Sequence, residues 1–261
     1  MATAEKRKGI VAGSQAERTF AVLPNDTKPW ATEAGNAIKK FLEKRKLSCE
    51  KEDPEFAIVI GGDGTLYYYR DLLEELGAKV VLIGSETTYR AQLSKSSWRE
   101  GLIELMQKGK PVSLPFLEVK SGSKQLGNAI NDVVFRSFDH RVISITCKMG
   151  ADQLTFRGDG LIIATPCGST GYSMSANGPE LPLGCASLIA TPICPCRSNG
   201  LPRVEPKITD AHRLKVTAGK GATLENASLI LDGAEPVLDS CGNKKFIVSK
   251  SGKHLEFLKL D

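Results

Sequence analysis

The sequence lacks the segments that would place it in or across a membrane. No apolar run approaches the roughly 18 residues of a membrane-spanning helix, and the polar, basic start MATAEKRKG has no apolar stretch behind it that would make a secretory signal. Aromatic residues make up only 6%, and the mild net charge of +5 is not gathered into a stripe of basic and aromatic side chains. We therefore expect a cytoplasmic protein that binds neither membranes nor nucleic acids and attracts small anions.

The sequence is also poor in residues suited to a structural metal site or a disulfide framework. It has three histidines and seven cysteines, of which only Cys194 and Cys196 lie close together. An odd number of widely spaced cysteines argues against a disulfide framework, and this pair lacks further ligands at zinc-binding spacing. We therefore expect the seven cysteines to be plain thiols.

The two parts of the chain follow different patterns. From about residue 20, the apolar runs FAIVI and KVVLI are typical of strands buried on both faces, and LYYYRDLLEEL predicts a helix that Gly77 ends. Ser97 and Glu100 predict a capping box for the next helix. This alternation predicts a parallel sheet with helices on its faces.

From about residue 112 the helical pattern disappears, and short strand-like runs separated by Gly, Pro, Asn or Asp follow one another. Such spacing favours an antiparallel β sandwich. We expect a flexible N-terminus over 1–18, a Rossmann-like α/β domain over 19–111, and a β-sandwich-like domain over 112–261. The extreme C-terminus is expected to pack back on the first domain.

The turn GGDGT, directly after FAIVI, comprises Gly61, Gly62, Asp63, Gly64 and Thr65. A glycine-rich turn between a strand and a helix lets backbone N–H groups approach phosphate oxygens. An aspartate there repels phosphate, so it suggests a metal ligand or a proton acceptor. The simpler interpretation is a turn in which Asp63 caps the helix.

Two further motifs contain polar residues where strands end or are interrupted. The run RGDGLIIATPCGSTGYSMSANGP (157–179) leads from a strand into a loop rich in hydroxyls and free amides, and Tyr172 could stack on a base. Asn131 and Asp132 interrupt an apolar strand and suit an adenine edge and ribose hydroxyls. The alternatives are a surface loop for 157–179 and a bulge or short turn for Asn131-Asp132.

Together the three motifs resemble the NAD kinase family, and LIATPICP (188–195) and LILDG (229–233) resemble later blocks of that family. The resemblance runs from about residue 20 to the end. It implies an α/β domain and a β domain with the site between them, in a homodimer or homotetramer. It also implies phosphorylation of the adenosine-ribose 2′-hydroxyl of NAD, with ATP or polyphosphate as the donor and Mg²⁺ held largely by the donor phosphates.

By position, Asp63 matches the proton acceptor of the family. Asn131 and Asp132 match the pair that grips the adenosine of NAD, where many members have glutamate in place of Asp132. Gly171 replaces the common alanine, as in archaeal-looking members. The other positions that match substrate-binding residues are Gly64, Arg157, Asp159, Thr170, Tyr172 and Ser175.

Several positions depart from the family pattern. LIGSETTYRAQLS (82–94) stands where the family has a block like GIN-G-LGFL, and Tyr89 could supply a substitute ring. Ala234 replaces a glutamine, Leu201-Pro202 stands where Arg-Pro is usual, and the sequence ends at LEFLKLD, where many members continue into a terminal helix. These changes bear on donor choice, nucleotide affinity and subunit packing.

Two other functions remain open on the sequence. Lipid kinases of the diacylglycerol type also have GGDGT on an α/β domain, although no apolar lipid-gripping segment stands out here. A non-catalytic NAD-binding regulator is compatible with the altered 82–94 block, but a pure binder gains little from Asp63 beside phosphates.

Overall fold

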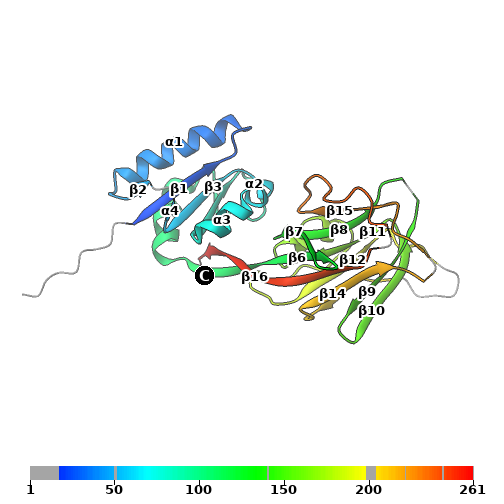
Figure 1. The fold of residues 1–261 in the computed structure, drawn as a ribbon. Helices are drawn as coiled ribbons and strands as arrows, with labels where there is room; N and C mark the ends of the chain where they lie inside the picture. Colours follow the sequence, from blue (N-terminus) through cyan, green and yellow to red (C-terminus); the bar gives the residue numbers. More distant parts are fainter. Residues whose placement is uncertain are drawn as a thin grey trace, which may run out of the picture.

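The computed structural model describes residues 18–49, 52–139, 141–197, 204–220, 222–242 and 244–260. An α/β lobe and a β lobe are joined by two long strands (Figure 1). The sequence expectations for residues 1–17 and for Leu201-Pro202 lie outside the described residues.

The α/β lobe is built on parallel strands. They pair in the order β4, β3, β1, β2, with the short β5 beside β4. Their bounds are β1 Thr19–Pro24, β2 Ser48–Cys49, β3 Phe56–Ile60, β4 Lys79–Gly84 and β5 Leu93–Ser94. All five residues of β3 are buried, as the continuous apolar run predicts for a strand covered on both faces.

Helices cover both faces of these strands. Alternate residues of β3 face opposite ways: Phe56, Ile58 and Ile60 pack with the first and last helices, while Ala57 and Val59 pack with the middle two. The helices are α1 Pro29–Glu43, α2 Asp63–Tyr68, α3 Arg70–Leu76 and α4 Trp98–Lys108.

The β lobe consists of two layers with a core between them. One layer is the antiparallel continuation of the first sheet, and the other is a separate antiparallel sheet in the order β13-β12-β11-β8-β15. The first layer contains β6 Lys110–Ser121, β7 Lys124–Ala129, β9 Ile143–Met149, β10 Asp152–Gly158, β14 Arg213–Ala218 and β16 Phe246–Lys259. The second contains β8 Asp132–Ser137, β11 Gly160–Ala164, β12 Leu188–Ile193, β13 Lys207–Thr209 and β15 Ala227–Leu231. The predicted fold class, an α/β part followed by a β-sandwich-like part, is confirmed.

Strand β16 connects the two lobes. It pairs antiparallel with β6 over most of its length, and Glu256 and Phe257 also pair in parallel with Lys79 and Val80 of β4. One eleven-stranded sheet therefore runs through both lobes. The division into domains at residue 111 stays a prediction.

Two local predictions about helices are wrong. LYYYRDLLEEL is not one helix, because the backbone of Tyr69 leaves helical geometry (φ −87°, ψ 3°) and separates α2 from α3. The Ser97 side chain does not cap α4; its hydroxyl accepts a hydrogen bond from the N–H of Ser94 instead. The predicted stop at Gly77 is confirmed by its left-handed φ of 59°.

The seven cysteines are free thiols. Within the described ranges, no helix is both long enough and apolar enough to cross a membrane.

Candidate active site

The GGDGT turn lies between β3 and α2. A Cβ at Gly61 would stand 2.2 Å from the Thr65 hydroxyl, so a larger residue could not share this turn with Thr65. Thr65 is buried and its hydroxyl accepts a hydrogen bond from the Asn25 amide at 3.0 Å. Gly64 is exposed, with open space where a Cβ would be. The turn therefore presents the Gly64 backbone outward and uses the Thr65 side chain internally.

Asp63 is the first residue of α2, and its carboxylate is bound by the backbone of the 82–94 segment. The N–H of Arg90 donates to Oδ1 at 3.0 Å, and the N–H of Tyr89 donates to Oδ2 at 3.3 Å. Asp63 does not cap α2 with its side chain, since Gly62 is the N-cap residue and no side chain caps that end.

The guanidinium of Arg90 reaches the motif at residues 157–179, called the second motif below. Its Nη2 donates to the carbonyl oxygens of Pro166 and Cys167 at 2.9 and 2.7 Å, and its Nε donates to Cys167 at 3.1 Å. Arg90 thus joins the Asp63 carboxylate to the loop at residues 165–178.

Asn131 lies in the turn between β7 and β8, Asp132 follows it as the first residue of β8, and both side chains are buried. The Asn131 amide nitrogen donates to the Asp132 carboxylate at 2.8 Å, while Asn131 Oδ1 has no hydrogen-bond partner among the residues that the structure describes. Burial, and then the nearby Asp232 carboxylate, raise the pKa of Asp132 to about 7. A buried acceptor without a partner and a carboxyl that titrates near neutrality are both typical of a binding site.

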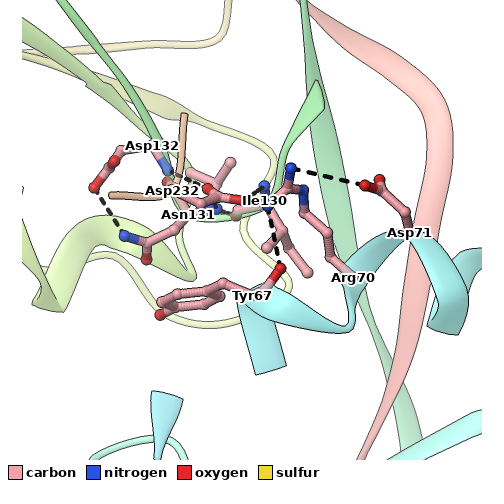
Figure 2. Close-up of polar contacts among 8 residues, drawn as sticks. Tyr67, Arg70, Asp71, Ile130, Asn131, Asp132 and Asp232 are labelled. Carbon is pink, nitrogen blue, oxygen red and sulfur yellow. Dashed lines mark hydrogen bonds and ion pairs between the residues drawn. The ribbon is translucent and has the colours of Figure 1, made fainter. Parts of the chain in front are cut away.

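The Asp232 carboxylate stabilises this turn by binding its backbone N–H groups (Figure 2). The carboxylate accepts the backbone N–H groups of Ile130, Asn131 and Asp132 at 3.0, 2.7 and 3.1 Å. It also forms an ion pair with Arg70, at the start of α3, at 3.4 Å. The φ of Asp232 is +52°, a conformation that costs a non-glycine residue energy, and these contacts hold it there. Burial raises the pKa of Asp232, although the three N–H groups and Arg70 act against this.

The loop of the second motif packs directly on Asn131. The hydroxyl of Thr165 donates to the carbonyl of Ile130 at 2.6 Å. A Cβ at Gly168 would stand 2.0 Å from the carbonyl oxygen of Asn131, and one at Gly171 would stand 3.5 Å from its side-chain nitrogen. Thr170, which is half-buried, ends the short helix η1 (Gly168–Thr170) between these two glycines.

A pocket of about 460 Å³ adjoins this loop, and Tyr172, Ser175 and Asp159 are among its lining residues. Tyr172 and Ser175 begin and end helix α5 (Tyr172–Ser175). The Arg136 guanidinium carbon lies 5.8 Å from the centre of the Tyr172 ring. Arg157 is exposed and lines a different pocket with Ser144 and Lys220.

Comparison with known proteins identifies the family. The chain is 31% identical to the NAD kinase of Thermomicrobium roseum over 84% of its own length and 78% of the relative. It is also 31% identical to the NAD kinase of Nitratidesulfovibrio vulgaris strain Miyazaki F, over 77% of this chain and 75% of that one. The chain belongs to the NAD kinase family. The family model of the ATP-NAD kinase C-terminal domain matches residues 139–260.

Two solved structures share the fold of this NAD kinase family member. Yeast NADH kinase complexed with NADH matches with a TM-score of 0.75 and 17% identity, covering 94% of this chain and 84% of that one. An NAD kinase from Archaeoglobus fulgidus in complex with ATP matches with a TM-score of 0.70 and 21% identity, covering 93% of each chain.

The site of this family member includes residues that sequence reasoning missed. Arg70, Arg90 and Asp232 connect the motifs, and none of them was predicted to belong to the site. Asp232 lies in the LILDG block, and the resemblance of that block to the family was the sequence signal that could have identified this residue. Arg90 lies in the 82–94 segment, whose sequence departs from the family pattern and carries no signal for this residue.

In the described part of the chain, no group of three or more His, Cys, Asp or Glu side chains could hold a metal ion.

Proposed function

We propose that the protein transfers a phosphoryl group from ATP or polyphosphate to the 2′-hydroxyl of the adenosine ribose of NAD, giving NADP. Family membership supports this activity. The observation that supports this activity at particular residues is the pair of contacts made by Arg90. Its backbone binds the Asp63 carboxylate, and its side chain binds the loop that packs on Asn131. A proton acceptor and a polar, buried nucleotide-binding turn then share one site.

The Asn131-Asp132 turn suits the adenosine of NAD. A buried acceptor left without a partner costs about 1–3 kcal/mol, and the exocyclic amino group of adenine would supply the missing donor for Asn131 Oδ1. Asp132 can bind ribose hydroxyls as either acceptor or donor, because its pKa of about 7 leaves both forms populated at neutral pH. We propose that Thr170, Gly171 and Tyr172 bind the same NAD molecule.

Asp63 serves as the proton acceptor. The two N–H groups on its oxygens occupy about half of the lone-pair sites of a carboxylate, so the others can accept the 2′-hydroxyl. As the hydroxyl oxygen bonds to phosphorus and the bond to the leaving phosphate oxygen breaks, the proton passes to Asp63. Such general-base assistance contributes roughly 10²–10⁴ in rate.

The donor phosphates are assigned to the outer side of the GGDGT turn. The exposed Gly64 lines a pocket of about 350 Å³ with Asn25, Thr27 and Tyr68, and a backbone without Cβ allows phosphate to approach closely. We further propose that Mg²⁺ arrives with these phosphates, whose charge it neutralises. That the enzyme acts in the cytoplasm and as a homo-oligomer stays a prediction.

The test is formation of NADP by the purified protein. NAD and NADH are each supplied with ATP or polyphosphate, with Mg²⁺ or Mn²⁺, and a diacylglycerol is tested in parallel. We expect NADP from NAD and no lipid phosphate. Binding of NAD with no NADP from any donor would instead support the non-catalytic regulator.

A further inference from the structure

The segment 85–92 spans the gap between the GGDGT turn and the second motif, and it is anchored at its far end. Gln92 accepts the N–H of Leu82 at 2.7 Å and donates to the carbonyl of Leu258 at 2.7 Å. At its start, the backbone of Thr88 donates to Ser85 at 3.1 Å. The segment is therefore a tethered strap.

Arg90 is the residue of this strap that contacts both sides of the site. Its backbone N–H binds the Asp63 carboxylate, and its guanidinium makes three hydrogen bonds to two carbonyl groups of the second motif. A guanidinium presents several donors in a rigid planar fork, so it can fix two neighbouring carbonyls at once. The backbone and the side chain of one residue thus determine where Asp63 lies relative to residues 166 and 167.

We propose that Arg90 is a positioning residue for the phosphoryl transfer, and that it acts by orienting Asp63. Rotation about the terminal bond of an aspartate is soft, so a single contact would leave the carboxylate plane free to turn. Here the N–H groups of Arg90 and Tyr89 bind different oxygens and fix that plane. The remaining lone pairs are then held toward the bound ribose. This inference rests on the proposed function.

The Tyr89 side chain makes a second, weaker tether. Its hydroxyl donates to Glu180 at 3.0 Å, but Tyr89 and Glu180 are both exposed. Exposed hydrogen bonds compete with water, so the buried carbonyls of Pro166 and Cys167 make Arg90 the stronger anchor.

The experiment compares kcat and KM for NAD in the wild type, Arg90→Ala, Arg90→Lys and, as a matched control, Arg99→Ala. Arg99 is exposed on α4, against the Trp98 ring. We expect Arg90→Ala to lower kcat by about 10- to 100-fold, because small misplacements of a reacting group have effects of this size. The kcat of Arg90→Lys should lie between those of the wild type and Arg90→Ala, because a single ammonium replaces the planar guanidinium. The kcat of Arg99→Ala should match that of the wild type.

An Asp63→Asn background separates positioning from general damage. If Arg90 acts through Asp63, the two residues form a unit whose effects do not add, and Arg90→Ala should change kcat by less than about threefold in that background. An equal loss in both backgrounds would overturn the proposal. So would a rise in kcat on Arg90→Ala, which would mean that the strap restrains Asp63.

Amide hydrogen exchange tests the same contact without activity. Arg90→Ala should expose the amides of Tyr89 and residue 90 while leaving β3 and β4 protected; unchanged protection of the strap would overturn the proposal. A wild type that makes no NADP would overturn the proposed function and the role of Arg90 in that transfer, whereas the exchange measurement decides separately whether Arg90 holds the strap against Asp63.

Discussion

The ion pair between Arg70 and Asp232 joins α3 of the first lobe to the turn after β15 in the second, and replacing Arg70 with methionine tests its importance. Methionine keeps an unbranched apolar chain and removes the charge. The Asp232 side chain is completely buried and that of Arg70 is 18% exposed. Removing one partner of a buried pair usually costs about 3–5 kcal/mol. We expect about 3 kcal/mol, because three backbone N–H groups still stabilise Asp232.

The assay is denaturant unfolding followed by circular dichroism, with Arg213→Met at an exposed position of β14 as the control. The destabilisation should shrink as the pH falls, because the ion pair requires an ionised Asp232 and burial raises the pKa of this carboxyl. KM for NAD should also rise, since Asp232 holds the Asn131-Asp132 turn. A change in unfolding free energy below about 0.5 kcal/mol at pH 8, the usual range of surface substitutions, would refute this reasoning.

Two further predictions concern the turn itself. The pKa of Asp132 is raised from 3.8 to about 7 in the folded protein, so the folded state binds more protons than the unfolded state between these values, and stability should fall as pH rises through this window. Asp132→Asn should flatten that fall in denaturant titrations at pH 5 and pH 8; an unchanged slope would contradict it. Gly168→Ala should destabilise the protein by about 1–3 kcal/mol, because the new Cβ would meet the carbonyl of Asn131 at 2.0 Å. Gly171→Ala, where the nearest atoms lie at 3.5 Å, should change the melting temperature little, and equal effects of the two substitutions would be evidence against this packing.

The order of elements was predictable because their local patterns agree with their final burial. FAIVI and KVVLI are continuous apolar runs, and the structure buries β3 completely and all but the first residue of β4. The break at Tyr69 was not predictable from apolar spacing, which continues through it. The C-terminus was expected to pack back on the first lobe, but the pairing of β16 with β4 was not predictable, because it joins residues about 180 positions apart through backbone groups that carry no sequence signal.

The site was predictable where one short motif contains the chemistry, as at Asp63 and at Asn131-Asp132. It was not predictable where a contact joins distant segments. Arg70 and Asp232 are far apart in the chain, and the sequence around either residue does not predict that the two form an ion pair. The role of Arg90 depends on where its backbone lies relative to Asp63, which only the fold determines.

The central claim is that Asp63 accepts the proton of the 2′-hydroxyl, and the most direct test pairs turnover with binding in Asp63→Asn. NADP formation is measured for this variant and for Asp152→Asn, a control at an exposed position of β10, and NAD binding is measured by calorimetry. We expect Asp63→Asn to lose roughly 10²–10⁴ of turnover while NAD still binds, and Asp152→Asn to keep full turnover. Near-normal turnover of Asp63→Asn would contradict the claim.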